Sequence, residues 1–169
     1  IDSPIRREKN FKVPMVAQTS WKGVLRSAVI EVTGDPNSGI VTRLFGEATK
    51  DDRGKAGELY CYPSYFMKRN GSKDHLPKEV INPRKRETGA GKWPIFFEVV
   101  DRGSVTEFHL TYLPSDLDNL GSDLVLICES IELAMGVFGI GAKTSSGYGR
   151  FDLDQLSGTL HVNYPLAEE

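Results

Sequence analysis

The part of this sequence best suited to chemistry is a glycine-rich segment, residues 136–151, which reads GVFGIGAKTSSGYGRF. Glycine uncovers the backbone and allows positive φ, so such a segment can bring its N–H groups close to a ligand. N–H groups combined with cationic and hydroxyl side chains suit a phosphate chain. We therefore predict a phosphate-binding loop, the alternative being a tight turn between a helix and a strand. The predicted contacts are Lys143, Thr144, Ser145, Ser146, Gly147, Tyr148 and Arg150.

Neither common nucleotide-binding motif fits this segment. The dinucleotide pattern GxGxxG requires a preceding strand and a following helix, whereas the order expected here is helix and then strand. The Walker pattern fails because Ala142 stands before Lys143–Thr144 where the pattern has glycine. A longer phosphate backbone remains as the ligand that the loop favours.

A second cationic feature lies on a predicted helix that Thr19 or Ser20 caps. Lys22 and Arg26 are four residues apart and therefore share one face, close to the positive end of the helix dipole. Gly23 costs about 1 kcal/mol relative to alanine inside a helix, which makes sense if something packs against the first turn. With Ser20, this edge suits phosphate oxygens; the alternative is a solvated basic edge.

A third cationic feature is the loop at residues 81–93, INPRKRETGAGKW, which precedes strand-like runs at 95–100 and 106–113. Such a loop can project from a sheet into a nucleic-acid groove. We expect Trp93 to pack at the base of the hairpin, the alternative being stacking on a base. The cations of this loop are Arg84, Lys85, Arg86 and Lys92.

The overall composition is that of a globular chain that forms one domain, residues 1–169, with 39% hydrophobic and 26% charged residues. Long apolar runs and a signal peptide are not visible, which favours a cytoplasmic protein without a membrane span. Cys61 and Cys128 have apolar neighbours and are expected to be buried free thiols, and no spacing indicates a zinc site.

Charge is distributed unevenly along the chain. Residues 1–92 hold 18 basic and 11 acidic side chains, whereas residues 93–169 hold 3 basic and 12 acidic ones. This asymmetry predicts one cationic face and an acidic surface for a basic neighbouring subunit, or simply solvated charge.

Apolar spacing predicts an α+β domain. The expected elements are a helix after Ser20, strands at 58–62, 95–100 and 106–113, a helix at 120–135 that Gly136 ends, and strands at 150–153 and 158–163, with mostly loop at 34–57 and 67–80. With one strand supplied before Ile1, this order fits a ferredoxin-like (RRM-like) β-α-β-β-α-β fold. Because the chain opens without methionine, we expect it to be a piece of a longer or multi-domain chain that lacks the first strand.

Three segments together resemble the RAMP superfamily of type III CRISPR effector complexes. The first helix carries a Ser-x-Lys-Gly before Leu-Arg, the basic loop and its strands are similar to the family's thumb hairpin, and GIGAKTSSGYGRF resembles its C-terminal glycine-rich signature. Trp21 departs from the small aliphatic residue usual in the family, which predicts a less flexible loop before the helix. The matching positions are Ser20, Lys22, Gly23, Leu25, Arg26, Arg86, Glu98, Gly103 and Phe108.

The resemblance implies an RRM-like subunit that grips guide RNA along its backbone and wedges a thumb into the guide–target duplex, in antiviral defence. The segment IDSPIRRE is similar to the family's catalytic loop, which makes Asp2 the candidate for metal-dependent cutting of target RNA. One carboxylate can hold Mg²⁺ or Mn²⁺ when water and RNA phosphates complete the shell, and the ribose 2′-OH then attacks the adjacent phosphate. The implied partners are guide RNA, complementary target RNA, other RAMP subunits, and the large and small subunits of the complex.

Three alternatives stay open. The chain is a non-cutting structural or end-cap RAMP subunit, since the KTSSGYG form of the loop also occurs in end-cap members. It is a guide-processing endoribonuclease, although that activity usually needs a general base and the histidines are dispersed at His75, His109 and His161. Otherwise it binds an acidic protein or a small ligand.

Overall fold

The computed structural model describes residues 4–47, 54–67, 76–84, 86–91 and 93–163 of the chain. Its helices are α1 (Gln18–Thr33), α2 (Gly39–Phe45) and α3 (Leu120–Leu133), followed by the π-helical turn η1 (Ala134–Phe138) and the 3₁₀ turns η2 (Thr144–Ser146) and η3 (Leu153–Gln155). Its strands are β1 (Met15–Val16), β2 (Gly46–Glu47), β3 (Lys55–Ala56), β4 (Leu59–Cys61), β5 (Ser64–Met67), β6 (Lys78–Ile81), β7 (Ile95–Glu98), β8 (Val105–Thr106) and β9 (Leu110–Tyr112).

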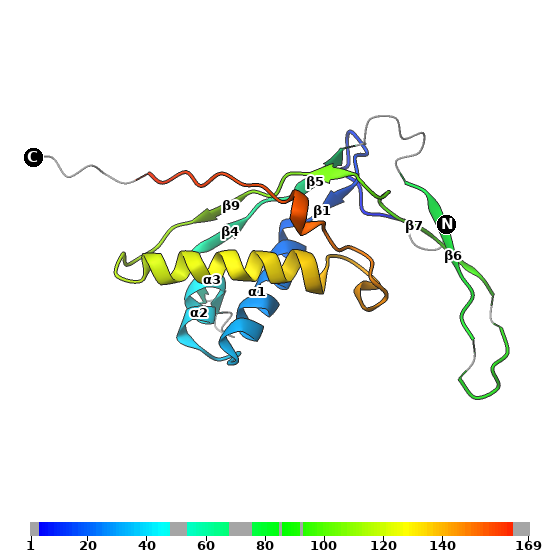
Figure 1. The fold of residues 1–169 in the computed structure, drawn as a ribbon, viewed down its shortest axis with the longest axis horizontal. Coiled ribbons are helices and arrows are strands. Elements are labelled where there is room, and N and C mark those ends of the chain that lie inside the picture. Colours follow the sequence, from blue (N-terminus) through cyan, green and yellow to red (C-terminus); the bar gives the residue numbers. More distant parts are fainter. Residues whose placement is uncertain (1–3, 48–53, 68–75, 85, 92, 164–169) are drawn as a thin grey trace, which may run out of the picture.

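Helix α1 packs against α3, and α2 lies beside α1 (Figure 1). The predicted apolar stripe of α1 is buried at four of its positions, Trp21, Leu25, Ala28 and Val29. The cap prediction is wrong, because α1 already begins at Gln18 after Ala17, which makes no side-chain cap hydrogen bond. The predicted loop at 34–57 is also wrong in part, since it contains α2 and the β2–β3 pair.

Helix α3 does not stop at Gly136 as predicted. The chain continues through η1, and Gly139, with a φ of +73°, ends it instead. A Cβ atom at Gly136 would lie 2.6 Å from Cδ1 of Leu153, so the Leu153 side chain packs directly on this glycine and would have to shift to make room for a larger residue. The backbone N–H of Phe151 donates to the carbonyl of Met135, which fixes the returning chain against η1.

The strands of the described residues form four small sheets, with orders β1-β5-β8, β2-β3, β4-β9 and β6-β7. In the central pair Leu59 lies opposite Tyr112 in an antiparallel ladder. The two-residue strand β1 directly precedes α1. The first strand of the ferredoxin-like pattern was expected before Ile1, and that expectation stays a prediction. Among the described residues no strand follows α3: part of 150–153 enters η3, and 158–163 has no ladder partner. The ferredoxin-like six-element pattern is therefore not confirmed, although the chain is mixed α and β.

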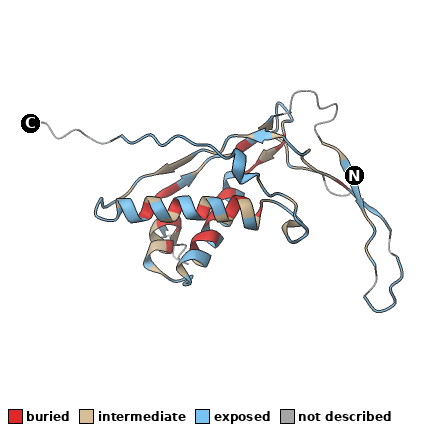
Figure 2. Cartoon of the chain, viewed as in Figure 1, coloured by how far each residue is buried: buried red, intermediate tan, exposed pale blue. Residues whose placement is uncertain are grey.

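Two hydrophobic clusters hold the body together, and Figure 2 shows them as the buried inner faces of the helices. The larger joins α1, α2, α3 and β4, and the smaller centres on Trp21. Trp21 is fully buried, its ring centroid lies 4.2 Å from that of Phe108, and its indole N–H donates to the Ser64 hydroxyl at 2.9 Å.

The two cysteines differ in exposure. Burial raises the pKa of the half-buried Cys61 thiol to about 11. Cys128 is exposed, so the predicted burial is wrong for Cys128.

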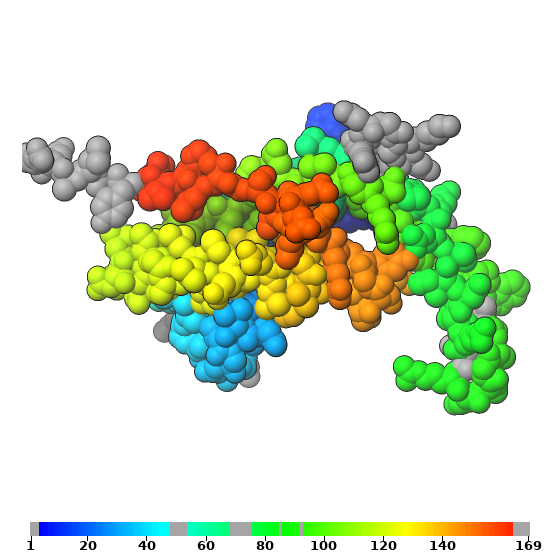
Figure 3. Space-filling model, viewed as in Figure 1, coloured from blue at the N-terminus to red at the C-terminus, as the bar shows by residue number. Residues whose placement is uncertain are grey.

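Two segments project from this body. The β6–β7 hairpin extends to one side in Figures 1 and 3, and residues 156–163 run away in the opposite direction. Both are largely exposed (Figure 2). In the described part of the chain, none of the helices has the length and apolar character needed to cross a membrane.

Candidate nucleic-acid interface

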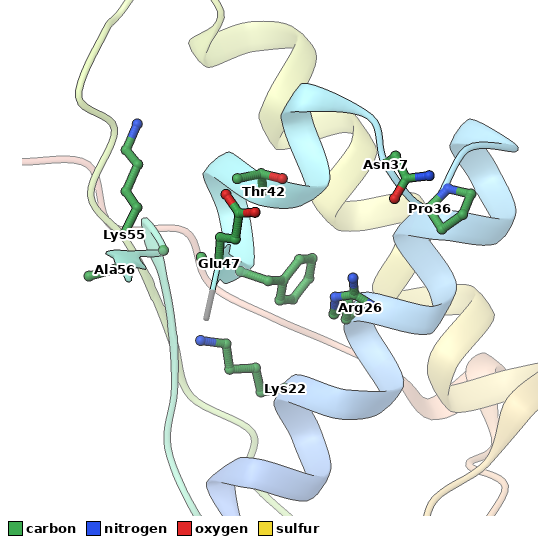
Figure 4. Close-up of a pocket in the computed structure, with 11 residues that line it drawn as sticks. Lys22, Arg26, Pro36, Asn37, Thr42, Glu47, Lys55 and Ala56 are labelled. Atoms are coloured by element: carbon green, nitrogen blue, oxygen red, sulfur yellow. The ribbon is translucent and has the colours of Figure 1, made fainter. Parts of the chain in front are cut away.

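The basic edge of α1 lines a pocket of about 710 Å³ between α1, α2 and the β2–β3 pair. Figure 4 shows Lys22 reaching from α1 toward β3, with Arg26 one turn further along the helix. Lys55 adds a third cation from β3, and Glu47 is the one carboxylate among the described residues that line the pocket. The spacing of Lys22 and Arg26 therefore does place both on one concave surface, with a basic residue from a distant segment beside them. The full lining is Lys22, Arg26, Pro36, Asn37, Thr42, Phe45, Gly46, Glu47, Lys55, Ala56 and Gly57.

Gly23 lies between these two cations, and nothing within the described chain packs against it. A Cβ atom built at Gly23 would meet no heavy atom within 4 Å. The partner that the sequence suggested for the first turn of α1 is therefore not found among the described residues. The helix keeps a glycine at an exposed position where alanine fits and would stabilise it by about 1 kcal/mol. Ser20, the other predicted contact on this edge, is exposed.

The glycine-rich loop folds back on itself. The N–H of Ile140 donates to the carbonyl of Gly149 at 2.9 Å, and a Cβ at Gly149 would lie 2.0 Å from the Ile140 carbonyl oxygen. Three of its N–H groups, those of Ser146, Gly147 and Tyr148, donate to carbonyls within the loop. These amides are therefore already occupied, contrary to the expectation of a freed backbone. Thr144 is half-buried, whereas Ser145, Ser146 and Arg150 are exposed.

The third predicted contact surface is the tip of the β6–β7 hairpin. Arg84 and Arg86 are exposed, and a bridge between Arg84 and Gly91 extends the hairpin beyond its strands. Gly89, with a φ of +67°, makes the turn. Trp93 is 90% exposed, so the expectation that it packs at the hairpin base is wrong, and its ring is open to solvent. Lys85 and Lys92 lie outside the described residues.

The glycine-rich loop and the hairpin meet, and Figure 3 shows the loop seated between the body and the hairpin. The Tyr148 hydroxyl donates to the Glu79 carboxylate, and this hydrogen bond raises the pKa of Tyr148. The Tyr148 ring meets the Phe97 ring edge-on, with centroids 5.8 Å apart. Nζ of Lys143 lies 4.4 Å from the Phe97 centroid, a cation–π distance.

Asp2, the candidate catalytic and metal-binding residue, lies outside the described residues. The segment that follows it is fixed to the hairpin: Nη2 of Arg7 lies 2.8 Å from both carboxylate oxygens of Glu98, and the N–H of Ile5 donates to the same carboxylate. Burial raises the pKa of Glu98, but the hydrogen bonds from Arg7 and Ile5 and nearby positive charge outweigh it, so the net pKa is lowered. Within the described ranges no cluster of three or more His, Cys, Asp or Glu is suited to a metal ion.

The structure thus brings the predicted contacts together as two surfaces. Among the described residues, none from the glycine-rich loop or the hairpin lines the α1 pocket, whereas the loop and the hairpin contact each other. Lys55 was not predicted as part of the site, because it lies in a polar stretch expected to be loop. Glu79 and Phe97 were not predicted as contacts of the glycine-rich loop, and no local pattern in the sequence indicates these pairings.

The fold is that of chains found in CRISPR complexes. A chain of the type III-B Cmr-beta complex bound to cognate target RNA superposes with a TM-score of 0.64 and 18% identity, over 86% of this chain and 47% of that one. The present chain therefore spans about half the length of that neighbour. A chain of a type IV-B CRISPR complex superposes with a TM-score of 0.62 and 16% identity, over 99% of this chain and 92% of that one.

The family follows from the sequence. The profile described as the RAMP superfamily matches residues 1–152, and the chain belongs to that superfamily, as the resemblance predicted. It is 25% identical over 173 aligned residues to the CRISPR system Cms endoribonuclease Csm3 of Streptococcus thermophilus. That alignment covers 94% of this chain and 77% of the Streptococcus protein. The protein of the same name from Enterococcus italicus is also 25% identical, over 92% of this chain and 79% of its own length.

Proposed function

We propose that this chain is an RNA-binding subunit of a type III CRISPR effector complex, similar in role to Csm3, and that it cuts guide-paired target RNA. The α1 pocket carries the RNA-binding part of the proposal: three cations from two distant segments line one open concavity. Such a surface suits the phosphates of a guide strand, because cationic side chains release the counterions condensed on the RNA. The superfamily membership and the structural neighbours in CRISPR complexes support the same assignment.

The cutting part of the proposal assigns Asp2 to the reaction, on the similarity of IDSPIRRE to the family's catalytic loop. A hard divalent ion such as Mg²⁺ would be held by this carboxylate, water and RNA phosphate oxygens, and it would supply charge stabilisation at the scissile phosphate. In this proposal the described residues bind the RNA. Glu98 in β7 accepts hydrogen bonds from Ile5 and Arg7, which holds the segment after Asp2 beside the hairpin. Other subunits and the guide are the proposed partners.

Binding of single-stranded RNA tests the pocket directly. Replacing Lys22 and Arg26 together with alanine is expected to raise the Kd at least about tenfold, because each charge-assisted contact contributes roughly 1.5–3 kcal/mol. The slope of log Kd against log salt is expected to fall by about 1.4, since each phosphate contact to a single strand contributes about 0.7. Fluorescence anisotropy across a salt series measures both quantities. Arg102→Ala, in an exposed turn outside the three surfaces, is the matched control. An unchanged slope in the double variant contradicts phosphate binding at the pocket.

Gly23 provides a sharper test of close approach. Gly23→Ala is expected to raise the free energy of unfolding by up to about 1 kcal/mol, since the new methyl group meets nothing within the chain. The same variant is expected to weaken RNA binding several-fold if the strand lies against the backbone between Lys22 and Arg26. Gly121→Ala, in the first turn of α3 and equally unobstructed, should leave binding unchanged. Urea unfolding and anisotropy separate the two effects, and a stabilised variant with unaltered affinity would place the RNA away from this turn.

A further inference from the structure

Four side chains join the glycine-rich loop to the base of the β6–β7 hairpin. Glu79 and Phe97 are directly paired in the antiparallel ladder, so both lie on the same face of the hairpin. Tyr148 reaches both of them, with its hydroxyl on the Glu79 carboxylate and its ring edge on Phe97. Lys143 completes the group from the start of η2. We call Glu79, Phe97, Lys143 and Tyr148 the junction.

The backbone of the loop is held in an unfavourable shape at this point. Lys143 has a φ of +64°, in the left-handed region that non-glycine residues rarely adopt. Such a conformation persists only where the surroundings impose it, and it concentrates at functional positions. The conformation of Lys143 is accompanied by the contact between its ammonium group and the Phe97 ring. Lys143, one of the cations of the predicted phosphate-binding loop, therefore contacts the hairpin through Phe97.

The opposite face of the same strand is also anchored. Glu98 follows Phe97 in β7, so its side chain points to the other face. Its side chain is only 7% exposed, and it holds Arg7 and the N–H of Ile5. The hairpin base is therefore held on one face by the glycine-rich loop and on the other by the N-terminal segment. Its tip, with Arg84 and Arg86, makes no comparable contact with the body among the bonds found in the described residues.

From these contacts we infer that the junction positions the hairpin tip relative to the glycine-rich loop, so that both bind one RNA strand as a single surface. This inference rests on the proposed RNA-binding function. Glu79, Phe97 and Tyr148 act as positioning residues: the Tyr148 hydroxyl is engaged by Glu79 and its ring packs on Phe97, which is 5% exposed. Two sites held at a fixed separation bind one ligand more tightly than two sites joined by a loose connection, because the second contact forms at a high effective concentration.

A double-mutant cycle tests the inference on the full chain with a single-stranded RNA. Tyr148→Phe combined with Phe97→Leu removes the hydrogen bond and the edge-on ring contact, and Arg84→Ala with Arg86→Ala removes the charge of the tip. We expect the junction variant to raise Kd about tenfold when the tip is intact and less than about twofold when the tip arginines are absent, because loosely held sites lose their cooperative contact. Glu132→Gln, at an exposed carboxylate on α3 outside the junction, is the control and is expected to bind like the wild type.

The outcomes separate this inference from the function it rests on. Equal loss in both tip backgrounds means that the junction contacts RNA itself, and no loss in either background means that it does not position the tip; both overturn the inference. If the wild type shows no salt-dependent binding, the proposed function fails instead. Tyr148→Phe alone serves as a second variant should Phe97→Leu unfold the hairpin, since it removes one hydroxyl at a half-buried position. Tyr148→Phe alone supports the inference if it raises Kd a few-fold when the tip arginines are present and leaves Kd unchanged when they are absent.

Discussion

Asp2→Ala is expected to lower the rate of target RNA cleavage at least about 10³-fold, with guide binding unchanged, if Asp2 supports the reaction as proposed. A metal-bound carboxylate contributes several kcal/mol of stabilisation to a developing charge, and each 1.36 kcal/mol is a factor of ten in rate. The residues assigned above to RNA binding lie on α1, in the glycine-rich loop and in the hairpin, and Asp2→Ala changes none of them. The variant should therefore still assemble with its guide.

The measurement uses the assembled complex with guide and end-labelled complementary RNA in Mg²⁺. Loss of one cleavage position with retained binding supports the proposal, and Glu132→Ala, an exposed carboxylate on α3, should cut like the wild type. Cleavage that continues unchanged in Asp2→Ala favours a structural or end-cap subunit that does not cut. Incubating the isolated chain with a precursor hairpin tests the remaining enzymatic alternative, because a guide-processing enzyme would cut it without other subunits.

Local sequence patterns predicted what depends on neighbouring residues. The four-residue spacing of Lys22 and Arg26 placed both on one edge because helical geometry alone determines that relation. The apolar stripe of α1 was predicted for the same reason. The other wall of the pocket, including Lys55, required knowing that β3 lies across from α1, and pairing between segments that far apart leaves no mark in a single sequence.

Three of the predictions made from the sequence were wrong for physical reasons that the structure shows. Alternation at residues 158–163 predicted a strand, yet a strand also needs an edge to pair with, and this segment is extended with Leu160 68% exposed. Gly136 was predicted to end the helix, but the helical backbone continues past it, and Leu153 from further along the chain packs against it. The glycine-rich loop was predicted to expose its N–H groups, and several bond within the loop because its glycines let it close on itself. The first two errors turn on partners from elsewhere in the chain, one absent and one present, whereas the third comes from hydrogen bonds between near neighbours.

A buried ionic network also joins segments that lie far apart in the sequence. Asp123 on α3 is fully buried, and Arg43 on α2 contacts both of its carboxylate oxygens, one of them at 2.9 Å from Nη2. The Tyr112 hydroxyl from β9 donates to the same carboxylate, and burial together with this bond raises the pKa of Tyr112 to about 12. Arg43 also lies 3.4 Å from Glu58 beside β4. One carboxylate thus joins a helix, a second helix and a strand.

Asp123→Ala is expected to lower the free energy of unfolding by about 3–5 kcal/mol at neutral pH, because it leaves the Arg43 charge half-buried without its main partner. The hydrogen bond from Arg43 lowers the pKa of Asp123, burial raises it and the Tyr112 bond lowers it further, with a lowered net value. A group whose pKa is lower in the folded state stabilises the protein above its unfolded pKa and loses that contribution as pH falls through the folded value. The difference between wild type and variant should therefore shrink in acid. Urea unfolding at neutral pH and near pH 2–3 measures it, with Glu129→Ala on the exposed side of α3 as the matched control. A gap that stays constant into acid would mean that the Asp123 site stabilises the fold through packing, and that its charge pairing with Arg43 contributes nothing.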